Sequence, residues 1–277
     1  MRVIETAEEF RAATSAIDRP LGLVPTMGAL HDGHMSLVSR ARSESATLAV
    51  SIFVNPAQFG PTEDYDSYPR DMDADYARLD EAGVDLLLAP TTDEMYPAGS
   101  NTRVDVGSPS ERLEGASRPG HFVGVATVVT KLLSIVRPDT AYFGQKDAQQ
   151  GLVIWRLNAD LNLGAQIVLC PIVREADGLA LSSRNAGLSA DERQAATVLY
   201  KALAAAKNMK TGNAEQVRRQ MREIISNEPL ASLDYVSVAN PQTLDELDVL
   251  TGSALALVAV RIGKTRLIDN MAIGSKA

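Results

Sequence analysis

The three histidines of the chain lie in two short stretches that are rich in glycine and proline. His31 and His34 belong to PTMGALHDGH at residues 25–34, and His121 belongs to RPGHF at residues 118–122. Two imidazoles three residues apart at the start of a helix lie on one face, and the glycine between them lets a ligand approach the backbone. Cationic or N–H-donating imidazoles there can hold phosphate oxygens and stabilise the charge that grows as pyrophosphate departs.

Two other interpretations of this histidine pair are a plain helix cap and a zinc site. Zinc requires a third and a fourth ligand, and the only other histidine is far along the chain. The surrounding glycines favour ligand binding over capping. An apolar run precedes the stretch and a helical pattern follows it, and strand, glycine turn and helix is the arrangement that delivers a phosphate to a helix N-terminus.

Polar residues also follow two other predicted strands. Gln58 ends the NPAQ segment at residues 55–58, where open α/β sheets place their ligands, and its amide suits a hydroxy acid. In GQKD at residues 144–147, Lys146 can reach a phosphate as a point charge and Asp147 opens the following helix. A polar loop residue and a solvated lysine are the respective alternatives.

A turn-rich stretch with hydroxyl and guanidinium groups lies at residues 181–184, with the sequence LSSR. Two hydroxyls and a planar multidentate donor suit triphosphate binding. The alternative is an interdomain linker, and both are compatible, because a loop that closes over the phosphates would couple binding to exclusion of water. Arg118 and His121 precede a long helical pattern, where they would be further anion contacts.

Composition limits the classes of partner. The net charge of −8 argues against nonspecific binding to nucleic acid, so positive charge for a small anion must be local. Apolar runs stay short of the roughly 18 residues of a membrane span, and no export signal is recognised. The single cysteine, Cys170, excludes an intrachain disulfide and is expected in the core. We expect a cytoplasmic protein with neither nucleic-acid nor membrane partners.

Strand and helix patterns alternate over the first part of the chain. Strands are predicted at residues 21–26, 48–54, 84–89, 140–143 and 167–173. Helices are predicted at residues 35–46, 71–82, 125–136 and 148–162. This alternation implies right-handed crossovers, and nearly continuous apolar strands fit a sheet covered on both faces. Residues 1–175 are therefore predicted as an α/β domain, a Rossmann-like parallel sheet with helices on both faces.

The pattern changes after about residue 173. Two helices are predicted at residues 189–208 and 214–226, followed by strands at 233–239, 254–260 and 265–268. The last two strands are separated by residues 261–264, a hairpin candidate. Residues 176–277 are predicted as a smaller α+β lid domain.

The stretch PTMGALHDGH contains the H-x-G-H signature of the nucleotidyltransferase superfamily, and its full length resembles the pantothenate synthetase family (pantoate–β-alanine ligases, AMP-forming). Further blocks at similar spacing cover most of the first 190 residues, whereas the last hundred resemble the family mainly at RLIDN, residues 266–270. The other blocks are SIFVNPAQF at 51–59, YPR at 68–70, LEGASRPGHF at 113–122, FGQKDAQQ at 143–150 and DGLALSSRN at 177–185.

The resemblance implies an ATP-dependent condensation of (R)-pantoate with β-alanine to pantothenate. A pantoyl adenylate forms on the way, and AMP and diphosphate are released. Among catalytic residues, it implies His34 as the strongest candidate, assisted by His31, Lys146, Ser182, Ser183 and Arg184. The implied ATP-binding residues are Met27, Gly28, Ala29, Leu30, His31, Asp32, Gly33, His34, Gly144, Gln145, Lys146, Asp147, Val173, Leu181, Ser182, Ser183 and Arg184.

Gln58 and Gln150 would hold pantoate, and Gln58 would also line the β-alanine site. Magnesium would be held largely by phosphate oxygens, and no protein ligand is assigned to it, although Asp75 could approach the metal or the β-alanine amine. The family also implies a homodimer. Two positions depart from the family pattern. Many family members have an acidic residue where this chain has Gln145, and an arginine is frequent where this chain has Val123.

Three rival functions stay open. Another nucleotidyltransferase of the H-x-G-H superfamily would make a stable nucleotide product, and the blocks with Gln58 and Gln150 argue against it. A tRNA synthetase is disfavoured by a short, acidic chain. An inactive nucleotide-sensing module is disfavoured by the intact histidine pair and the LSSR stretch.

Overall fold

The computed structural model describes residues 1–61 and 65–274. The chain divides into two compact units. The first comprises Met1–Gln145 and Gln149–Pro171, and the second comprises Lys146–Ala148 and the chain from Ile172 onward. The division at Pro171 falls slightly before the predicted boundary at residue 175. Within the described residues, no helix is both long enough and apolar enough to cross a bilayer.

The first unit is built on a six-stranded sheet in which every neighbouring pair is parallel. The order is β1-β4-β3-β2-β5-β6. The strands are β1 (Arg2–Ile4), β2 (Leu21–Thr26), β3 (Thr47–Ile52), β4 (Leu86–Leu88), β5 (Thr140–Gly144) and β6 (Gln166–Cys170). The predicted α/β class is confirmed. Sequence reasoning missed β1, a short strand at the edge of the sheet.

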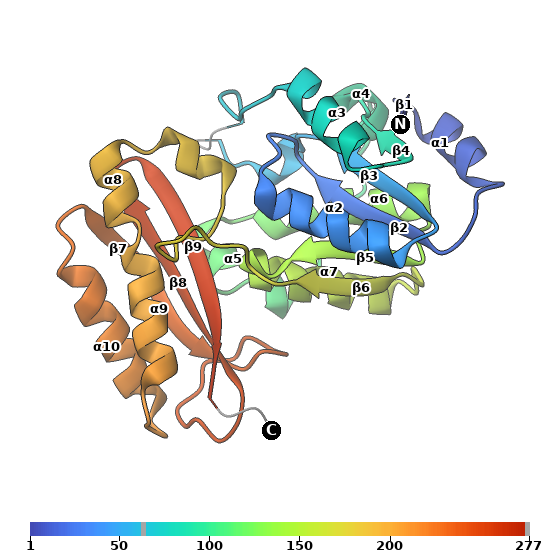
Figure 1. Cartoon of the computed structure of the whole chain (residues 1–277). Coiled ribbons are helices and arrows are strands. Elements are labelled where there is room, and N and C mark those ends of the chain that lie inside the picture. Colours follow the sequence, from blue (N-terminus) through green and yellow to red (C-terminus); the bar gives the residue numbers. More distant parts are fainter. Residues whose placement is uncertain (62–64, 275–277) are drawn as a thin grey trace. The chain divides into compact units, whose positions relative to one another are not determined.

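Helices cover both faces of this sheet (Figure 1). On one face, α2 (Asp32–Glu44) and α3 (Met72–Glu81) bury apolar side chains in a core with β2 and β3. On the other face, α1 (Ala7–Thr14), α6 (His121–Val136) and α7 (Ala148–Asp160) share a second core. Two cores explain why the central strands are apolar at nearly every position.

The sheet reverses its strand order beside β2. The chain runs from β2 to β3 on one side and later returns to β5 on the other, with Gly22 paired to Thr140. Because ligands of open α/β sheets bind at the carboxyl ends of strands where the order reverses, the segments after β2 and β5 occupy the expected position. These segments contain His31 and Gln145.

The second unit is a three-stranded antiparallel sheet of β7 (Ala231–Ala239), β8 (Ala254–Ile262) and β9 (Thr265–Ile273), in that order. The helices α9 (Val198–Asn208) and α10 (Ala214–Ser226) share its core. The predicted hairpin is confirmed, because Ile262 pairs with Thr265 across a two-residue turn. Gly263 in that turn has φ 56°, which a glycine adopts without strain.

Among the predicted elements whose bounds differ from the structure, two have a clear local cause. The helix predicted at 189–208 is divided into α8 (Ala190–Ala195) and α9, and at the break the Thr197 hydroxyl donates to the Gln194 carbonyl at 2.7 Å, a bond that competes with the helix ladder. The strand predicted at 167–173 ends at Cys170, because Pro171 lacks the N–H that would continue the ladder.

An acidic residue at the start of α10 lies between two arginines. The Glu215 carboxylate contacts Arg218 and Arg222 at 2.7 Å each, and these hydrogen bonds lower its pKa to about 2. A lowered pKa stabilises the folded state above the ordinary value of roughly 4.3 and this contribution is lost as pH falls toward the folded value. We therefore expect the difference in melting temperature between wild type and Glu215→Gln to shrink between pH 4.5 and pH 2, whereas a constant difference would contradict the prediction.

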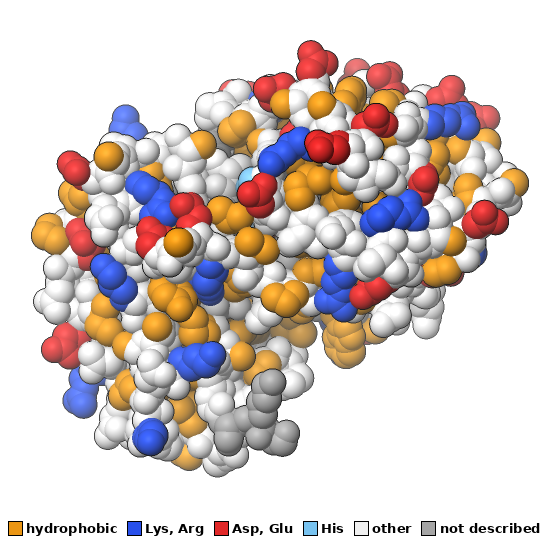
Figure 2. Space-filling view, viewed as in Figure 1, with side chains coloured by type: hydrophobic (Ala, Val, Ile, Leu, Met, Phe, Trp, Pro, Cys, Tyr) orange, Lys and Arg blue, Asp and Glu red, His pale blue; other side chains and the backbone are white. Residues whose placement is uncertain are grey.

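Acidic side chains gather on the visible surface near α3 and α4 (Thr92–Met95) (Figure 2). The exposed acids of α3 and its N-cap include Asp71, Asp73 and Asp80. An anionic ligand would be repelled by this surface, so its binding depends on individually placed donors.

Candidate active site

The two neighbouring histidines cap the N-terminus of α2 reciprocally. His31 is the N-cap, and its Nδ1 accepts from the Gly33 N–H at 3.1 Å. His34 Nδ1 accepts from the His31 N–H at 3.3 Å, and the ring centroids are 4.0 Å apart. A ring nitrogen that accepts carries no proton, so in this arrangement each imidazole presents its N–H at Nε2. Helix capping is thus real, and it also fixes the tautomer that offers an Nε2–H donor.

Backbone N–H groups of the loop before α2 are largely used inside the protein. The Gly28 N–H donates to Thr26 Oγ1 at 3.2 Å, and the N–H groups of Ala29 and Leu30 donate to Asp75 at 2.8 Å each. Together with the two capping bonds, these contacts satisfy five donors between residues 28 and 33. Anion binding by this loop therefore relies more on the imidazoles than the glycine-turn pattern predicts.

Gln58 lies beside Met27. The short 3-10 helix η1 (Pro56–Gln58) follows β3, and the Gln58 amide nitrogen contacts Met27 Sδ at 3.1 Å. Asn55 holds the other end of the amide by donating to Gln58 Oε1 at 3.0 Å. One predicted substrate residue and one predicted ATP-binding residue are thus brought together in the first unit.

Asn55 is a positioning residue that sequence reasoning missed. Only 1% of it is exposed, and it also donates to the Gly124 carbonyl at 3.2 Å. The Tyr96 hydroxyl donates to Asn55 Oδ1 at 2.8 Å. Burial raises the pKa of Tyr96 to about 12, so the phenol keeps its donor proton at neutral pH. The local signal was the Asn-Pro pair at the strand end, but the Tyr96 contact joins distant parts of the sequence.

Helix α6 approaches η1 closely at Gly124. A Cβ atom on this residue would overlap the Ala57 carbonyl and crowd the Gln58 nitrogen. These atoms belong to the backbone of η1, which cannot move away as the end of a flexible side chain could. Gly124 therefore permits the contact that places Gln58.

Gly124→Ala is expected to destabilise the first unit by about 1–3 kcal/mol because of overpacking, although alanine favours helices over glycine. Gly151→Ala in α7 is the matched control, since the atoms nearest to its Cβ would belong to the movable end of the Leu169 side chain. Thermal unfolding of both variants checks the prediction. An unchanged or raised melting temperature for Gly124→Ala would show that the close approach is dispensable.

His121 and Arg118 support the same glutamine from its backbone. His121 Nδ1 lies 2.8 Å from the Gln58 carbonyl oxygen, and Arg118 Nη1 lies 3.0 Å from His121 Nε2. This arrangement fits an imidazole that donates from Nδ1 and accepts from the guanidinium at Nε2. Their expected role as anion contacts stays a prediction, because these contacts are to protein groups.

The adjacent glutamines of α7 have different environments. Gln149 is 3% exposed, accepts from the Glu114 N–H at 3.0 Å and donates to the Pro109 and Arg112 carbonyls. Gln150 is only partly buried. Gln149 thus organises residues 109–114, whereas the partly exposed Gln150 is open to a ligand, and its expected contact with pantoate stays a prediction.

The predicted segment after β5 crosses from one unit to the other along the chain. Gly144 ends β5 and Gln145 begins a 3-10 turn, and both belong to the first unit. Lys146 belongs to the second, where its Nζ lies 3.6 Å from Asp147 Oδ1. Asn270 of β9 donates to the Lys146 carbonyl at 2.9 Å. The RLIDN block therefore helps to position Lys146.

A turn in the second unit brings Val173 next to Leu181. The Leu181 N–H donates to the Val173 carbonyl at 3.0 Å, and Gly178 has φ 94° in the turn between them. Ser182 then caps the 3-10 helix η4 (Ser183–Gly187), and its hydroxyl accepts from the Arg184 N–H at 3.4 Å. The predicted ATP-binding residues on both sides of this turn are thus neighbours.

A buried ion pair anchors the start of this turn. Arg174 contacts both oxygens of Asp269, at 2.6 and 2.9 Å, and also donates to the Gly178 carbonyl at 3.0 Å. Burial raises the pKa of Asp269, while Arg174 opposes the rise. Adjacent residues of β9 therefore position both the turn and Lys146.

Asp75 has a structural role that the sequence did not indicate. Both carboxylate oxygens accept from backbone N–H groups of the loop before α2, and an approach of Asp75 to magnesium or the β-alanine amine stays a prediction. Among the described residues, no group of three or more His, Cys, Asp or Glu side chains is placed to hold a metal ion.

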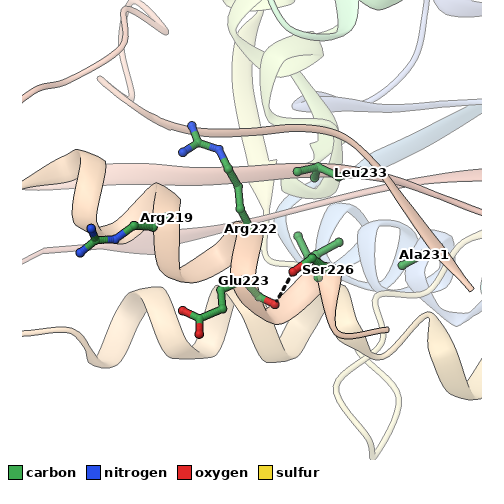
Figure 3. Close-up of a pocket in the computed structure, with 7 residues that line it drawn as sticks. Arg219, Arg222, Glu223, Ser226, Ala231 and Leu233 are labelled. Carbon is green, nitrogen blue, oxygen red and sulfur yellow. Dashed lines mark hydrogen bonds between the residues drawn. The ribbon is translucent and has the colours of Figure 1, made fainter. Parts of the chain in front are cut away.

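Each unit has a hollow lined by described residues. The first, of about 220 Å³, lies at the carboxyl ends of β2, β3 and β4, and its lining includes Met27, Gly28, Phe53 and Asp75. The second, of about 650 Å³, lies between α10 and β7 (Figure 3). Its described lining contains none of the residues predicted from the sequence. The first hollow therefore adjoins the candidate site and the second does not.

Comparison with known proteins matches nearly the whole chain to one family. The profile of the family described as pantoate-beta-alanine ligase matches residues 2–272. A pantothenate synthetase of Roseiflexus castenholzii is 58% identical over 273 residues, which cover 98% of both chains. One of Gluconobacter oxydans is 53% identical over 274 residues, covering 98% of this chain and 99% of the relative.

Two solved structures of similar proteins also match the chain over nearly its full length. A pantothenate synthetase from Thermus thermophilus has a TM-score of 0.94 at 48% identity, covering 98% of this chain and 99% of that one. A pantoate-beta-alanine ligase from Francisella tularensis, complexed with beta-gamma ATP and beta-alanine, has a TM-score of 0.82 at 36% identity, covering 98% of this chain and 97% of that one.

Proposed function

Because the chain belongs to the pantoate-beta-alanine ligase family, we propose that it condenses (R)-pantoate with β-alanine in a reaction driven by ATP. The products are pantothenate, AMP and diphosphate. Family membership over nearly the whole chain carries this proposal, and the histidine pair at the start of α2 supports the chemistry.

The reaction has two steps. An oxygen of the pantoate carboxylate attacks the α-phosphorus of ATP, and the bond to the β-phosphate bridging oxygen breaks, so that diphosphate leaves and pantoyl adenylate forms. The β-alanine amine then attacks the acyl carbon, the acyl C–O bond breaks, and AMP leaves as the amine loses a proton. Activation is needed because a carboxylate is a poor electrophile, and the carboxylate itself needs no base because it is ionised at neutral pH.

His34 and His31 act in the first step as donors to the phosphates. Their Nδ1 atoms are acceptors in the helix cap, which favours Nε2–H donors held in a fixed direction. Donors that are oriented before the reaction stabilise developing charge without reorganisation. The two imidazoles therefore stabilise the charge on the departing diphosphate.

Lys146, Ser182, Ser183 and Arg184 supply further phosphate contacts. Lysine contributes a point charge and arginine a planar set of donors, while each hydroxyl donates one hydrogen bond. The local order around these residues supports the assignment, since Asn270 fixes the Lys146 backbone and Ser182 caps η4. The remaining ATP contacts are those expected for Met27–Asp32, Gly33, Gly144, Gln145, Asp147, Val173 and Leu181.

Gln58 and Gln150 bind pantoate, and Gln58 also borders β-alanine. The hydrogen bond from Asn55 supports this role for Gln58, because it fixes the amide whose nitrogen lies on Met27. Magnesium accompanies ATP and is held mainly by phosphate oxygens, as is usual for this ion. When bound, it neutralises phosphate charge.

A homodimer and a cytoplasmic location complete the proposal. The homodimer comes from the family resemblance, and the cytoplasmic location comes from the composition with its single cysteine. Sedimentation velocity of the purified chain is expected to give twice the monomer mass. A monomer at working concentration would remove dimerisation from the proposal without affecting the chemistry.

Product analysis tests the proposed function. We expect AMP formation only when pantoate, β-alanine and ATP are all present, with diphosphate released from pantoate and ATP before β-alanine is added. Hydroxy-acid and amine analogues serve as controls. A nucleotide retained in the final product would instead indicate a nucleotidyltransferase, and ATP binding without turnover would indicate a nucleotide sensor.

A further inference from the structure

A buried carboxylate of helix α3 accepts hydrogen bonds from the backbone of the loop before α2. Asp75 Oδ2 accepts from the Ala29 N–H and Oδ1 accepts from the Leu30 N–H, both at 2.8 Å. Asp75 is only 2% exposed. A buried carboxylate requires such donors because its charge has lost hydration. Both oxygens are therefore directed toward the backbone of the loop.

Arg78, on the next turn of α3, forms hydrogen bonds with the same loop. Its guanidinium donates to the Leu30 carbonyl and contacts Asp32 Oδ1 at 2.8 Å. Residues three apart on a helix share a face, so Asp75 and Arg78 reach the loop together. Leu30 is held at both its N–H and its carbonyl, by residues more than 40 positions away in the sequence.

The loop conformation explains why external support is needed. Gly28 has φ 81° and Ala29 has φ 51°. The left-handed region is unfavourable for alanine, which persists there only when the surroundings impose it. One of the two hydrogen bonds that Asp75 accepts comes from the N–H of Ala29 itself. The turn at Gly28 and Ala29, which leads the chain into His31, is thus stabilised by contacts with α3 rather than by the local preference of Ala29.

We infer that Asp75 and Arg78 are positioning residues that set the direction of the His31–His34 pair for the adenylate-forming step. This inference rests on the proposed function, in which that pair binds the phosphates. The two side chains act through the loop backbone and the N-cap, and neither needs to contact a substrate. Misplacement of a catalytic group by about 1 Å can cost roughly 10²-fold in rate.

Asp75→Asn tests the inference with almost no change in shape. The amide nitrogen faces a backbone N–H, so one of the two loop bonds becomes a contact between donors. We expect diphosphate release from pantoate and ATP to slow by about 10- to 100-fold. Aminolysis of supplied pantoyl adenylate by β-alanine is expected to stay close to wild type, because that half-reaction involves no departing diphosphate.

Arg78→Met and Arg78→Lys extend the test at a position where loss of folding is not expected, since the Arg78 side chain is 41% exposed. Methionine removes both contacts and should slow the same half-reaction, whereas lysine should restore part of the rate by donating to one partner. Asp73→Asn on the exposed face of α3 is the matched control and should behave as wild type.

Three results would overturn the inference. They are normal diphosphate release in Asp75→Asn, equal slowing of both half-reactions in Arg78→Met, and no recovery in Arg78→Lys. If Asp75→Asn fails to fold, the two Arg78 variants decide. Failure of the proposed function is recognised separately, because the wild-type chain itself would then release no diphosphate from pantoate and ATP.

Discussion

His34→Ala is expected to slow diphosphate release from ATP and pantoate by about 10²-fold or more, the usual effect of removing an oriented donor. The substitution deletes the Nε2–H that would meet the phosphates, and it also deletes the Nδ1 that accepts from the His31 N–H at 3.3 Å. Rapid-quench measurement of diphosphate in the absence of β-alanine isolates this step. A near-normal rate would remove His34 from the mechanism.

His34→Gln separates catalysis from helix capping. Glutamine at the third helical position can accept from the N-cap N–H as in a capping box, so the fold of α2 should be retained. Its amide still carries N–H donors, but while Oε1 accepts the capping bond the direction of these donors is set by that bond and differs from the direction of the imidazole Nε2–H. We expect a variant with wild-type melting temperature that is nearly as slow as His34→Ala. Recovery of activity in His34→Gln would mean that the oriented imidazole Nε2–H is not required for the step.

Lys146→Met is expected to slow the same step by a similar factor of about 10². The chain has a net charge of −8, so attraction of the phosphates depends on individually placed cations such as this ammonium. Because the Lys146 carbonyl is held by Asn270, the backbone should stay in place when the side chain is changed. Stopped-flow assays of diphosphate release at saturating ATP give the rate without the contribution of ATP affinity.

Lys201→Met in α9 is the control for Lys146→Met, since Lys201 is exposed and lies outside every predicted site block. It should retain full activity. Lys146→Arg keeps the charge with a different donor geometry and should recover part of the rate. If Lys146→Met matches wild type at saturating ATP, its charge has no role in the chemical step.

Much of the fold follows from local sequence patterns. Apolar strands separated by helical patterns predict the parallel sheet, and the helix predicted at residues 214–226 matches α10 (Ala214–Ser226). The hairpin between β8 and β9 was also predictable, because Gly263 marks the turn. These features depend on residues close together in the chain, which is where periodicity and turn chemistry carry information.

Other features depend on contacts between distant residues. The division of the helix predicted at 189–208 depends on a Thr197 hydroxyl whose choice of partner the pattern does not reveal. In the site, the histidine pair was evident because the chain has only three histidines. Asp75 looked like one more acid in a helix start, and only the fold shows it bound to Ala29 and Leu30.

Pantoate labelled with ¹⁸O in both carboxylate oxygens, supplied together with ATP and β-alanine, tests the adenylate mechanism through the fate of the label. If the carboxylate attacks the α-phosphorus, the AMP that leaves in the second step retains one oxygen from pantoate. We expect AMP carrying a single ¹⁸O and pantothenate carrying the other. AMP without label would contradict an adenylate intermediate.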